Sequence, residues 1–216
     1  MSHHPCANES LGGVLVRFAI YGILSLALGQ VIVWKLNSVG VIALASENGM
    51  LEWMQVGLTL CTAGVFARVY FMGKSGATVF GVLACVVAYA GAKECDSFLE
   101  SFLFDDAYKY VAGGPLALLV FFLVCRGRDE FVSDLSHAIA ARWFGIFVTA
   151  GILLISLCQL FDSAGLWETF DQSTALREAK LLVEETSELY VYYFLAVAAL
   201  ECWFQSKGNA LPAATA

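Results

Sequence analysis

The segment RWFGIFVTAGILLISLCQLFD, residues 142–162, decides the fold class of this chain. Between Arg142 and Asp162 it contains 19 uncharged residues, most of them apolar. A helix needs roughly 20 residues to cross the ~30 Å hydrocarbon layer of a bilayer. The run is apolar on all faces and much longer than the roughly 10 alternating residues of a barrel strand. It therefore predicts a membrane-spanning helix.

Further uncharged runs lie along the whole chain. Four of them contain 17, 15, 18 and 16 residues, and their flanking charges are Arg17/Lys35, Glu52/Arg68, Lys74/Lys93 and Lys109/Arg126. Flanking Lys and Arg side chains can reach back to the membrane surface, which makes these lengths sufficient. We predict an all-α fold, a polytopic bundle of six transmembrane helices that forms a single integral membrane domain over residues 1–216. The spans are expected at about 13–35, 50–72, 76–97, 108–126, 142–161 and 183–205.

The composition agrees with a membrane protein. Hydrophobic residues make up 59 % of the chain and charged residues 14 %, whereas soluble proteins contain roughly 25 % charged residues. Such a composition excludes a secreted disulfide scaffold, a disordered tail and a nucleic-acid-binding domain. The net charge of −7 also opposes polyanionic partners. The expected partner is the lipid bilayer, with a cation or a lipid headgroup as the candidate ligand.

The charges are distributed unevenly between the two ends of the predicted bundle. Six spans place both termini on one side, with 7 basic and 5 acidic residues, while the other side has 5 basic and 14 acidic residues. The excess of Lys and Arg places the first side, and both termini, in the cytoplasm. In a bacterium the membrane would be the plasma (inner) membrane. The extracytoplasmic end is strongly acidic, and such a field concentrates cations.

The last predicted helix gives the strongest indication of a site. Its apolar core, Leu189 to Leu200, covers only ~18 Å at 1.5 Å per residue. Completing the span draws Glu188, together with Glu184 or Glu185, towards the hydrocarbon, where a carboxylate at the centre of a helix costs about 2.5–3.5 kcal/mol. We therefore expect these side chains to face the interior of the bundle. Glu185, Glu188 and Tyr192 share one helical face.

Two other helices bring polar faces to the same end. Glu52 and Gln55 lie on one face with Thr59 and Thr62, which are either part of a polar track or hydroxyls that bond to their own helix. Lys93, Asp96 and Glu100 share a face of the 76–97 helix and its continuation. The candidate cation or ligand-binding residues are Glu52, Gln55, Asp96, Glu100, Glu184, Glu185 and Glu188, with Lys93 and Tyr192 in supporting positions.

Crowded carboxylates have three physical outcomes, which are a bound cation, shared protons or salt bridges to basic residues. Oxygen ligands without histidine favour Ca²⁺, Mg²⁺ or Mn²⁺, and the candidate ligands are Glu52, Asp96, Glu185 and Glu188. No haem is expected, because the three histidines, His3, His4 and His137, all lie on the cytoplasmic side.

The sequence thus favours a transporter- or channel-like membrane protein with a carboxylate-rich extracytoplasmic pocket that binds a cation or protons. Two alternatives stay open. One is a membrane-embedded, metal-dependent hydrolase or transferase that acts on a lipid headgroup. The other is a structural or assembly subunit with a buried salt-bridge network. The sequence does not decide whether the protein is an enzyme.

Overall fold

The protein is a bundle of helices. A computed structural model describes residues 11–73, 77–168, 170 and 173–208, and this part of the chain contains helices and turns but no strand. The helices are α1 (Leu11–Ala45), α2 (Met50–Phe71), α3 (Ala77–Lys93), α4 (Asp96–Phe102), η1 (Lys109–Gly113), α5 (Gly114–Arg126), α6 (Arg128–Ile139), α7 (Arg142–Leu153), η2 (Leu154–Cys158), α8 (Gln159–Asp162), α9 (Ala164–Trp167) and α10 (Thr174–Gly208). The predicted all-α class is confirmed. The prediction that both termini lie in the cytoplasm concerns residues 1–10 and 209–216, which lie outside the described residues.

Several helices are long and apolar enough to cross a membrane. Four segments meet this criterion, namely α1, α2, Lys109–Arg126 and Arg142–Asp162. The pair α3 and α4 adds a fifth if it counts as one span, although the two helices are bent by 66° relative to each other. The chain is therefore compatible with an integral membrane protein with four or five spans, and the sixth predicted span is not confirmed. The missing span corresponds to α10, whose charged and tyrosine residues lower its hydropathy.

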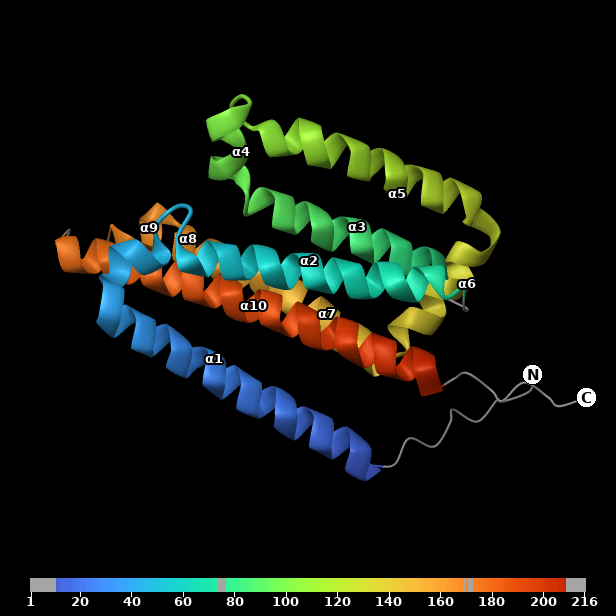
Figure 1. Ribbon diagram of the computed structural model, residues 1–216. Helices are drawn as coiled ribbons and strands as arrows, with labels where there is room; N and C mark the ends of the chain where they lie inside the picture. Colours follow the sequence, from blue (N-terminus) through green and yellow to red (C-terminus); the bar gives the residue numbers. More distant parts are fainter. Residues whose placement is uncertain (1–10, 74–76, 169, 171–172, 209–216) are drawn as a thin grey trace, which may run out of the picture.

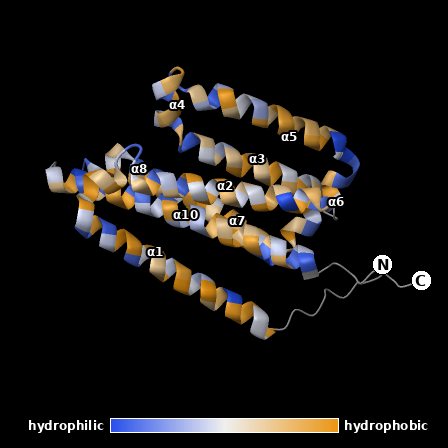
Figure 2. Cartoon of the chain, in the orientation of Figure 1, coloured by the Kyte–Doolittle hydropathy of each residue, from blue (hydrophilic) through white to orange (hydrophobic). Residues whose placement is uncertain are grey.

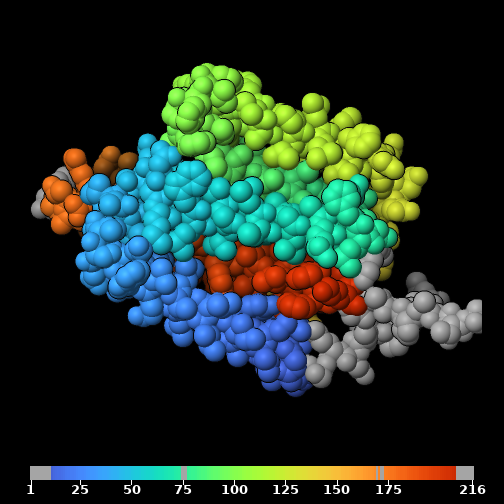
Figure 3. Space-filling model, viewed as in Figure 1, coloured from blue at the N-terminus to red at the C-terminus, as the bar shows by residue number. Residues whose placement is uncertain are grey.

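The position of α10 explains why it is polar. It packs against α1, α2 and α7, and Figure 1 shows it running through the middle of the bundle. In the space-filling view α10 (red) lies between α1 (blue) and α2 (cyan) (Figure 3). By contrast, α1 and the segment 109–126 each have only 6 % of their apolar window buried, and they are coloured mostly as hydrophobic in Figure 2. The less apolar α10 thus lies inside the bundle, whereas α1 and the segment 109–126 expose most of their apolar surface.

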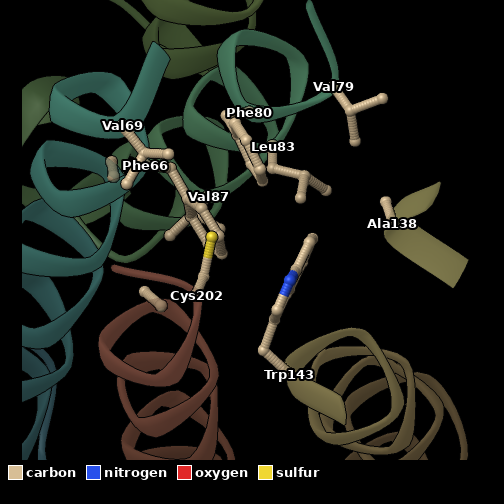
Figure 4. Packing of buried hydrophobic residues seen from close by; sticks show 11 residues of the cluster. Phe66, Val69, Val79, Phe80, Leu83, Val87, Ala138, Trp143 and Cys202 are labelled. Carbon is tan, nitrogen blue, oxygen red and sulfur yellow. The ribbon is translucent and has the colours of Figure 1, made fainter. Parts of the chain in front are cut away.

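An aromatic core holds one half of the bundle together. Phe66 of α2, Phe80 of α3 and Trp143 of α7 meet there, with Cys202 of α10 beside them (Figure 4). The ring centroids of Phe66 and Trp143 are 6.0 Å apart, and those of Phe80 and Trp143 are 5.6 Å apart. The core occupies the half that contains the C-terminal end of α2 and the N-terminal end of α3. Two of the four buried acids among the described residues, Glu94 and Glu188, lie in the opposite half.

The helices α2 and α3 approach each other closely where a glycine faces a threonine. A Cβ atom added to Gly91 would lie 2.5 Å from Oγ1 of Thr59. A real side chain does not fit at that distance, so the missing side chain of Gly91 allows this approach.

The chain bends sharply after α3. The predicted span 76–97 ends as a regular helix at Lys93, and Cys95 adopts φ −95° and ψ 13° before α4 begins at Asp96. The helix ends where its apolar run ends, at the charged residues Lys93, Glu94 and Asp96. The helical face that was predicted to continue from Lys93 through Asp96 to Glu100 is consequently interrupted.

Candidate functional site

The buried half of the candidate site lies where α2 meets α10. Gln55 is fully buried, and its Nε2 donates to the main-chain oxygen of Glu185 at 3.0 Å and to Oε2 of the same residue at 3.0 Å. Two acceptors on one side fix the orientation of the amide. The structure therefore brings together two of the candidates, one from each helix.

The amide oxygen of Gln55 is not satisfied. Within the described residues, Oε1 of Gln55 is buried and has no hydrogen-bond partner. A buried carbonyl without a donor costs roughly 1–3 kcal/mol. A proton donor or a cation beside this oxygen would remove that cost.

A second buried contact joins α10 to the end of α3. The hydroxyl of Tyr192 donates to Oε1 of Glu94 at 2.7 Å, and these side chains are 2 % and 9 % exposed. Lys93 Nζ lies 3.9 Å from the same carboxylate oxygen, but the Lys93 side chain is 53 % exposed. The carboxylate of Glu94 is thus held mainly by the tyrosine.

Glu188 completes the buried cluster. It lies one helical turn from both Glu185 and Tyr192 on α10, is 9 % exposed, and feels the charges of Glu94 and Lys93. The carboxyl groups of Glu94 and Glu188 therefore share one half-exposed lysine, and Glu185 lies one helical turn from Glu188. We call these three residues together with Gln55 and Tyr192 the inner cluster.

The polar stripe of α2 does not continue as a track of free hydroxyls. Oγ1 of Thr59 donates to the carbonyl of Gln55 at 2.9 Å, and Oγ1 of Thr62 donates to that of Leu58 at 2.7 Å. Both threonines are about fully buried. Of the two interpretations of these residues, the structure favours hydroxyls that bond to their own helix at a helix interface.

An acidic group of a different kind lies on α4 and the turn that follows it. Carboxylate oxygens of Asp96, Glu100 and Asp106 lie within 4.8 Å of one another. Glu100 Oε1 accepts the main-chain N–H of Asp106 at 2.8 Å, and Lys109 Nζ lies 2.5 Å from Asp106 Oδ1. Oδ1 of Asp96 is buried without a hydrogen-bond partner among the described residues. We call this group the outer triad.

The crowding of carboxylates in the outer triad affects the pKa of Asp96. The helix α4 lies beyond the bend, outside the apolar segment of α3. Burial raises the pKa of Asp96, and the charge of Asp106 raises it further, while Lys109 acts in the opposite direction. The proton is therefore held more tightly at this position than on an ordinary aspartate.

The sequence-based candidates are thus divided between two places. Gln55, Glu185, Glu188 and Tyr192 belong to the inner cluster, with Lys93 at its edge, whereas Asp96 and Glu100 belong to the outer triad. The four expected metal ligands, Glu52, Asp96, Glu185 and Glu188, do not form a group with ligand atoms within 4.8 Å; in the described part of the chain only the outer triad does. Glu184 is half-buried on α10, and the nearby Lys180 lies 3.8 Å from Asp162.

Glu52 occupies the mouth of the site. Its carboxylate accepts the main-chain N–H of Asn48. It also lines a small hollow together with six other residues, which are Asn48, Trp53, Val56, Glu94, Cys95 and Phe98. The hollow connects Glu52 to the buried Glu94 and thus to the inner cluster.

Sequence reasoning missed Glu94. On a straight helix Glu94 lies off the face of Lys93, Asp96 and Glu100, but the bend at Cys95 separates it from Asp96 and turns it towards Tyr192. Its position beside Lys93, at the end of an apolar run, was the feature of the sequence that could have indicated a buried acid.

A further buried acid, Glu201, was also missed. It is 1 % exposed, and its carboxylate accepts Nε of Arg17 at 2.7 Å, Nη2 of Arg17 at 3.1 Å and the hydroxyl of Tyr21 at 2.9 Å. We call these three residues the α1–α10 clamp. The signal in the sequence was a lone arginine and a lone glutamate at matching depths of two apolar helices.

No known protein family, curated protein or solved structure matches the chain.

Proposed function

We propose that the protein is a multi-pass membrane protein whose inner cluster takes up protons or a small cation, in a transporter- or channel-like role. The cluster opens to the acidic, extracytoplasmic end, and both termini lie in the cytoplasm. The single observation that carries the proposal is the fully buried carbonyl of Gln55, which has no donor among the described residues although the other side of the same amide contacts the carboxyl group of Glu185.

The excess of acidic over basic side chains in the inner cluster supports the proposal. Three carboxyl groups lie in the cluster, and in the described part of the chain the basic side chain beside them is Lys93, 3.9 Å from the carboxylate of Glu94. Taking each carboxylate out of water costs several kcal/mol, and one half-exposed ammonium group cannot compensate for all three. Protons or a cation must therefore neutralise part of the cluster.

The lack of hydrogen-bond donors for the oxygen atoms of the inner cluster also supports the proposal. A carboxylate can only accept hydrogen bonds, and so can the free oxygen of Gln55. A protonated Glu185 or Glu188 would supply a donor for such an oxygen. A bound cation would serve the same oxygen as a ligand.

A structural network alone would look different. In the α1–α10 clamp every oxygen of Glu201 has a donor, and one carboxylate faces one guanidinium in a two-point contact. The inner cluster has an excess of acids and an unsatisfied carbonyl. This difference favours a ligand over a purely structural role.

One observation favours a second function. The outer triad offers three carboxylates within 4.8 Å, which is the kind of oxygen-rich group that holds Ca²⁺, Mg²⁺ or Mn²⁺. A metal at this level would suit a hydrolase or transferase that acts on a lipid headgroup. The ion pair between Lys109 and Asp106 competes with such a metal, so this function ranks second.

The test compares uptake in three forms of the reconstituted protein. Liposomes containing wild type, Glu188→Gln or Glu47→Gln are given a pH jump, with and without Na⁺, K⁺ or Ca²⁺, and the internal pH is followed with a dye. Glu47 is exposed at the same end and serves as the matched control. We expect uptake in wild type and Glu47→Gln and its loss in Glu188→Gln.

Two results would contradict the proposal. One is equal uptake by wild type and Glu188→Gln. The other is the absence of uptake in wild type together with no effect of Glu188→Gln on proton binding in detergent, measured by potentiometric titration. Metal analysis of wild type against Asp96→Asn tests the second function separately, because Asp96 is not in the inner cluster.

A further inference from the structure

Two basic side chains from different helices converge on one tryptophan, at the end of the bundle opposite the inner cluster. Trp203 lies near the C-terminal end of α10. The guanidinium carbon of Arg68, on α2, lies 5.8 Å from the centroid of its ring, and the ammonium group of Lys207 lies 4.1 Å from it. The helices α2 and α10 pack against each other, and Figure 1 shows their C-terminal ends at the same end of the bundle. The fold therefore holds two positive charges around a single indole.

The charges of both cations are uncompensated by acids in the described part of the chain. Arg68 and Lys207 are exposed, and neither forms an ion pair with an acid among those residues. The acid nearest to Trp203 in the sequence is Glu201, whose carboxylate is already bound by Arg17 and the hydroxyl of Tyr21. A contact with an aromatic face orients a cation but leaves its charge in place. An anion that arrives here thus meets two positive charges.

The indole of Trp203 independently lacks a hydrogen-bond acceptor. Its Nε1 is buried and has no partner among the described residues. An indole N–H can only donate, and a buried donor without an acceptor is a cost to the folded state. Lys207 lies over this ring, and movement of its exposed, flexible side chain uncovers the indole. Charge and hydrogen bonding therefore call for the same kind of ligand, which is a negatively charged acceptor.

The donors and their level in the bundle select a phosphate group. A guanidinium presents paired N–H donors that match phosphate oxygens, and an ammonium group adds a compact positive charge. Arg68 lies at the end of the apolar run of α2, one of the candidate membrane spans. That is the depth of lipid phosphates, where tryptophan is also enriched. Basic side chains between helices bind anionic headgroups at the cytoplasmic surface, which is where the proposed orientation places this end.

We propose that Arg68, Lys207 and Trp203 bind a phosphate group. The two cations neutralise it, and the indole N–H donates to one of its oxygen atoms. An anionic phospholipid and a soluble phosphate both carry this group. The site goes beyond the proposed function, because none of its three residues belongs to the inner cluster.

The first experiment titrates the purified full chain in detergent with phosphatidylglycerol or phosphatidylcholine and follows binding by native mass spectrometry. We expect wild type to prefer phosphatidylglycerol. Arg68→Gln and Lys207→Gln should each weaken this binding roughly fivefold, and the double variant roughly twenty-five-fold, which is the contribution of basic side chains near an anionic surface. Arg128→Gln is the matched control, because it removes the same charge from an exposed position on α6 at the same end.

A third variant tests the indole. Trp203→Phe keeps an aromatic face for the two cations and removes the N–H, so we expect phosphatidylglycerol to bind roughly two- to tenfold more weakly. Trp203 packs against the aromatic core, and its variant is therefore checked for unfolding in the same detergent. Arg68 and Lys207 are exposed, so their variants test the site even if Trp203→Phe does not fold.

A second arm identifies the source of the phosphate. Isothermal titration calorimetry measures binding of inorganic phosphate to the delipidated wild type, the double variant and Arg128→Gln. A preference for phosphatidylglycerol that is lost in the double variant, without binding of inorganic phosphate, supports a lipid headgroup. Binding of inorganic phosphate that is lost in the double variant, without a preference between the two lipids, supports a soluble phosphate.

The inference is overturned if wild type neither prefers phosphatidylglycerol nor binds inorganic phosphate. It is also overturned if the double variant of Arg68 and Lys207 binds both as tightly as wild type and Arg128→Gln. Either result leaves the uptake that depends on Glu188 untouched, so the proposed function would stand. Conversely, phosphate binding that depends on Arg68 and Lys207, with uptake that is indifferent to Glu188→Gln, would reject the proposed function alone.

Discussion

Acidic side chains at two levels of α10 have opposite electrostatic surroundings. At the C-terminal end, Glu201 forms a two-point ion pair with Arg17 and accepts the hydroxyl of Tyr21. Nearer the middle of α10, Glu185 and Glu188 share their surroundings with Glu94, and among the described residues the half-exposed Lys93 offers the nearby positive charge. One acid is fully neutralised, whereas the others are crowded.

This difference distinguishes a structural ion pair from a cluster suited to binding a ligand, which the sequence alone could not do. A matched ion pair joins α1 to α10 at one level, and an apolar cluster with Ile32, Leu44 and Leu189 joins them at another. A crowded cluster with an unsatisfied amide costs stability, and proteins keep such arrangements where they bind or move something. The stability cost of substitutions in the α1–α10 clamp can therefore be compared directly with the cost of the same substitutions in the inner cluster.

The largest expected effect comes from breaking the clamp. Glu201→Gln removes the carboxylate that Arg17 and Tyr21 share, and breaking a buried pair in this way costs about 3–5 kcal/mol of unfolding free energy. The measurement is reversible unfolding in mixed detergent micelles. A loss below about 1 kcal/mol, the usual value of an exposed pair, would show that the clamp does not hold α1.

A smaller effect is expected from the tyrosine of the inner cluster. Tyr192→Phe removes the hydroxyl that donates to the buried Glu94, and a hydrogen bond to a charged group contributes about 1.5–3 kcal/mol. Tyr190→Phe is the matched control, since its hydroxyl bonds to the carbonyl of Ser25 at 3.2 Å and its loss should cost about 0.5–1.5 kcal/mol. Equal costs in the same unfolding assay would contradict a stronger hydrogen bond at Glu94 than at the carbonyl of Ser25.

The same Glu-to-Gln change in the inner cluster should have almost no cost. Glu188→Gln keeps the shape of the side chain, removes one of three crowded acids and adds a donor near Gln55. We expect the unfolding free energy to stay within about 1 kcal/mol of wild type or to rise. A loss as large as that of Glu201→Gln would mean that Glu188 is paired as well as Glu201 is.

The smallest effect concerns pH and the outer triad. Because the pKa of Asp96 is raised in the folded protein from its ordinary value of 3.8, the folded state binds this proton more tightly than the unfolded state. This contribution is fully present below the ordinary pKa and is lost as the pH rises through the folded pKa. Asp96→Asn should therefore flatten the fall of the melting temperature over this acidic range, and an unchanged pH profile would contradict the assignment.

The helices could be predicted from the sequence because each apolar run carries its own signal. The runs at residues 142–162 and 109–126 are helical segments long enough to cross a membrane. The convergence of Gln55 with Glu185 followed from helical spacing and from the short apolar core of α10. The same reasoning counted α10 as a span, although its tyrosines and Glu201 lower its hydropathy to suit the interior of the bundle.

The rest depended on contacts between segments distant in the chain. Glu94 reaches Tyr192 only because the chain bends after Lys93, and spacing along a straight helix places it on another face. The pairing of Trp53 with Phe98 and of Arg17 with Glu201 requires knowing which helices are neighbours. A single sequence gives the period of each helix but not its rotation against the next.

The absence of a side chain at Gly91 has a consequence beyond its own contact. It lets α3 approach Thr59 two residues before the helix ends, and this close approach sets how deeply the last residues of α3 enter the bundle. A methyl group there would push that terminus outwards and lengthen the reach from Glu94 to the tyrosine hydroxyl. One missing carbon atom therefore tunes the geometry of an acid three residues further along the chain.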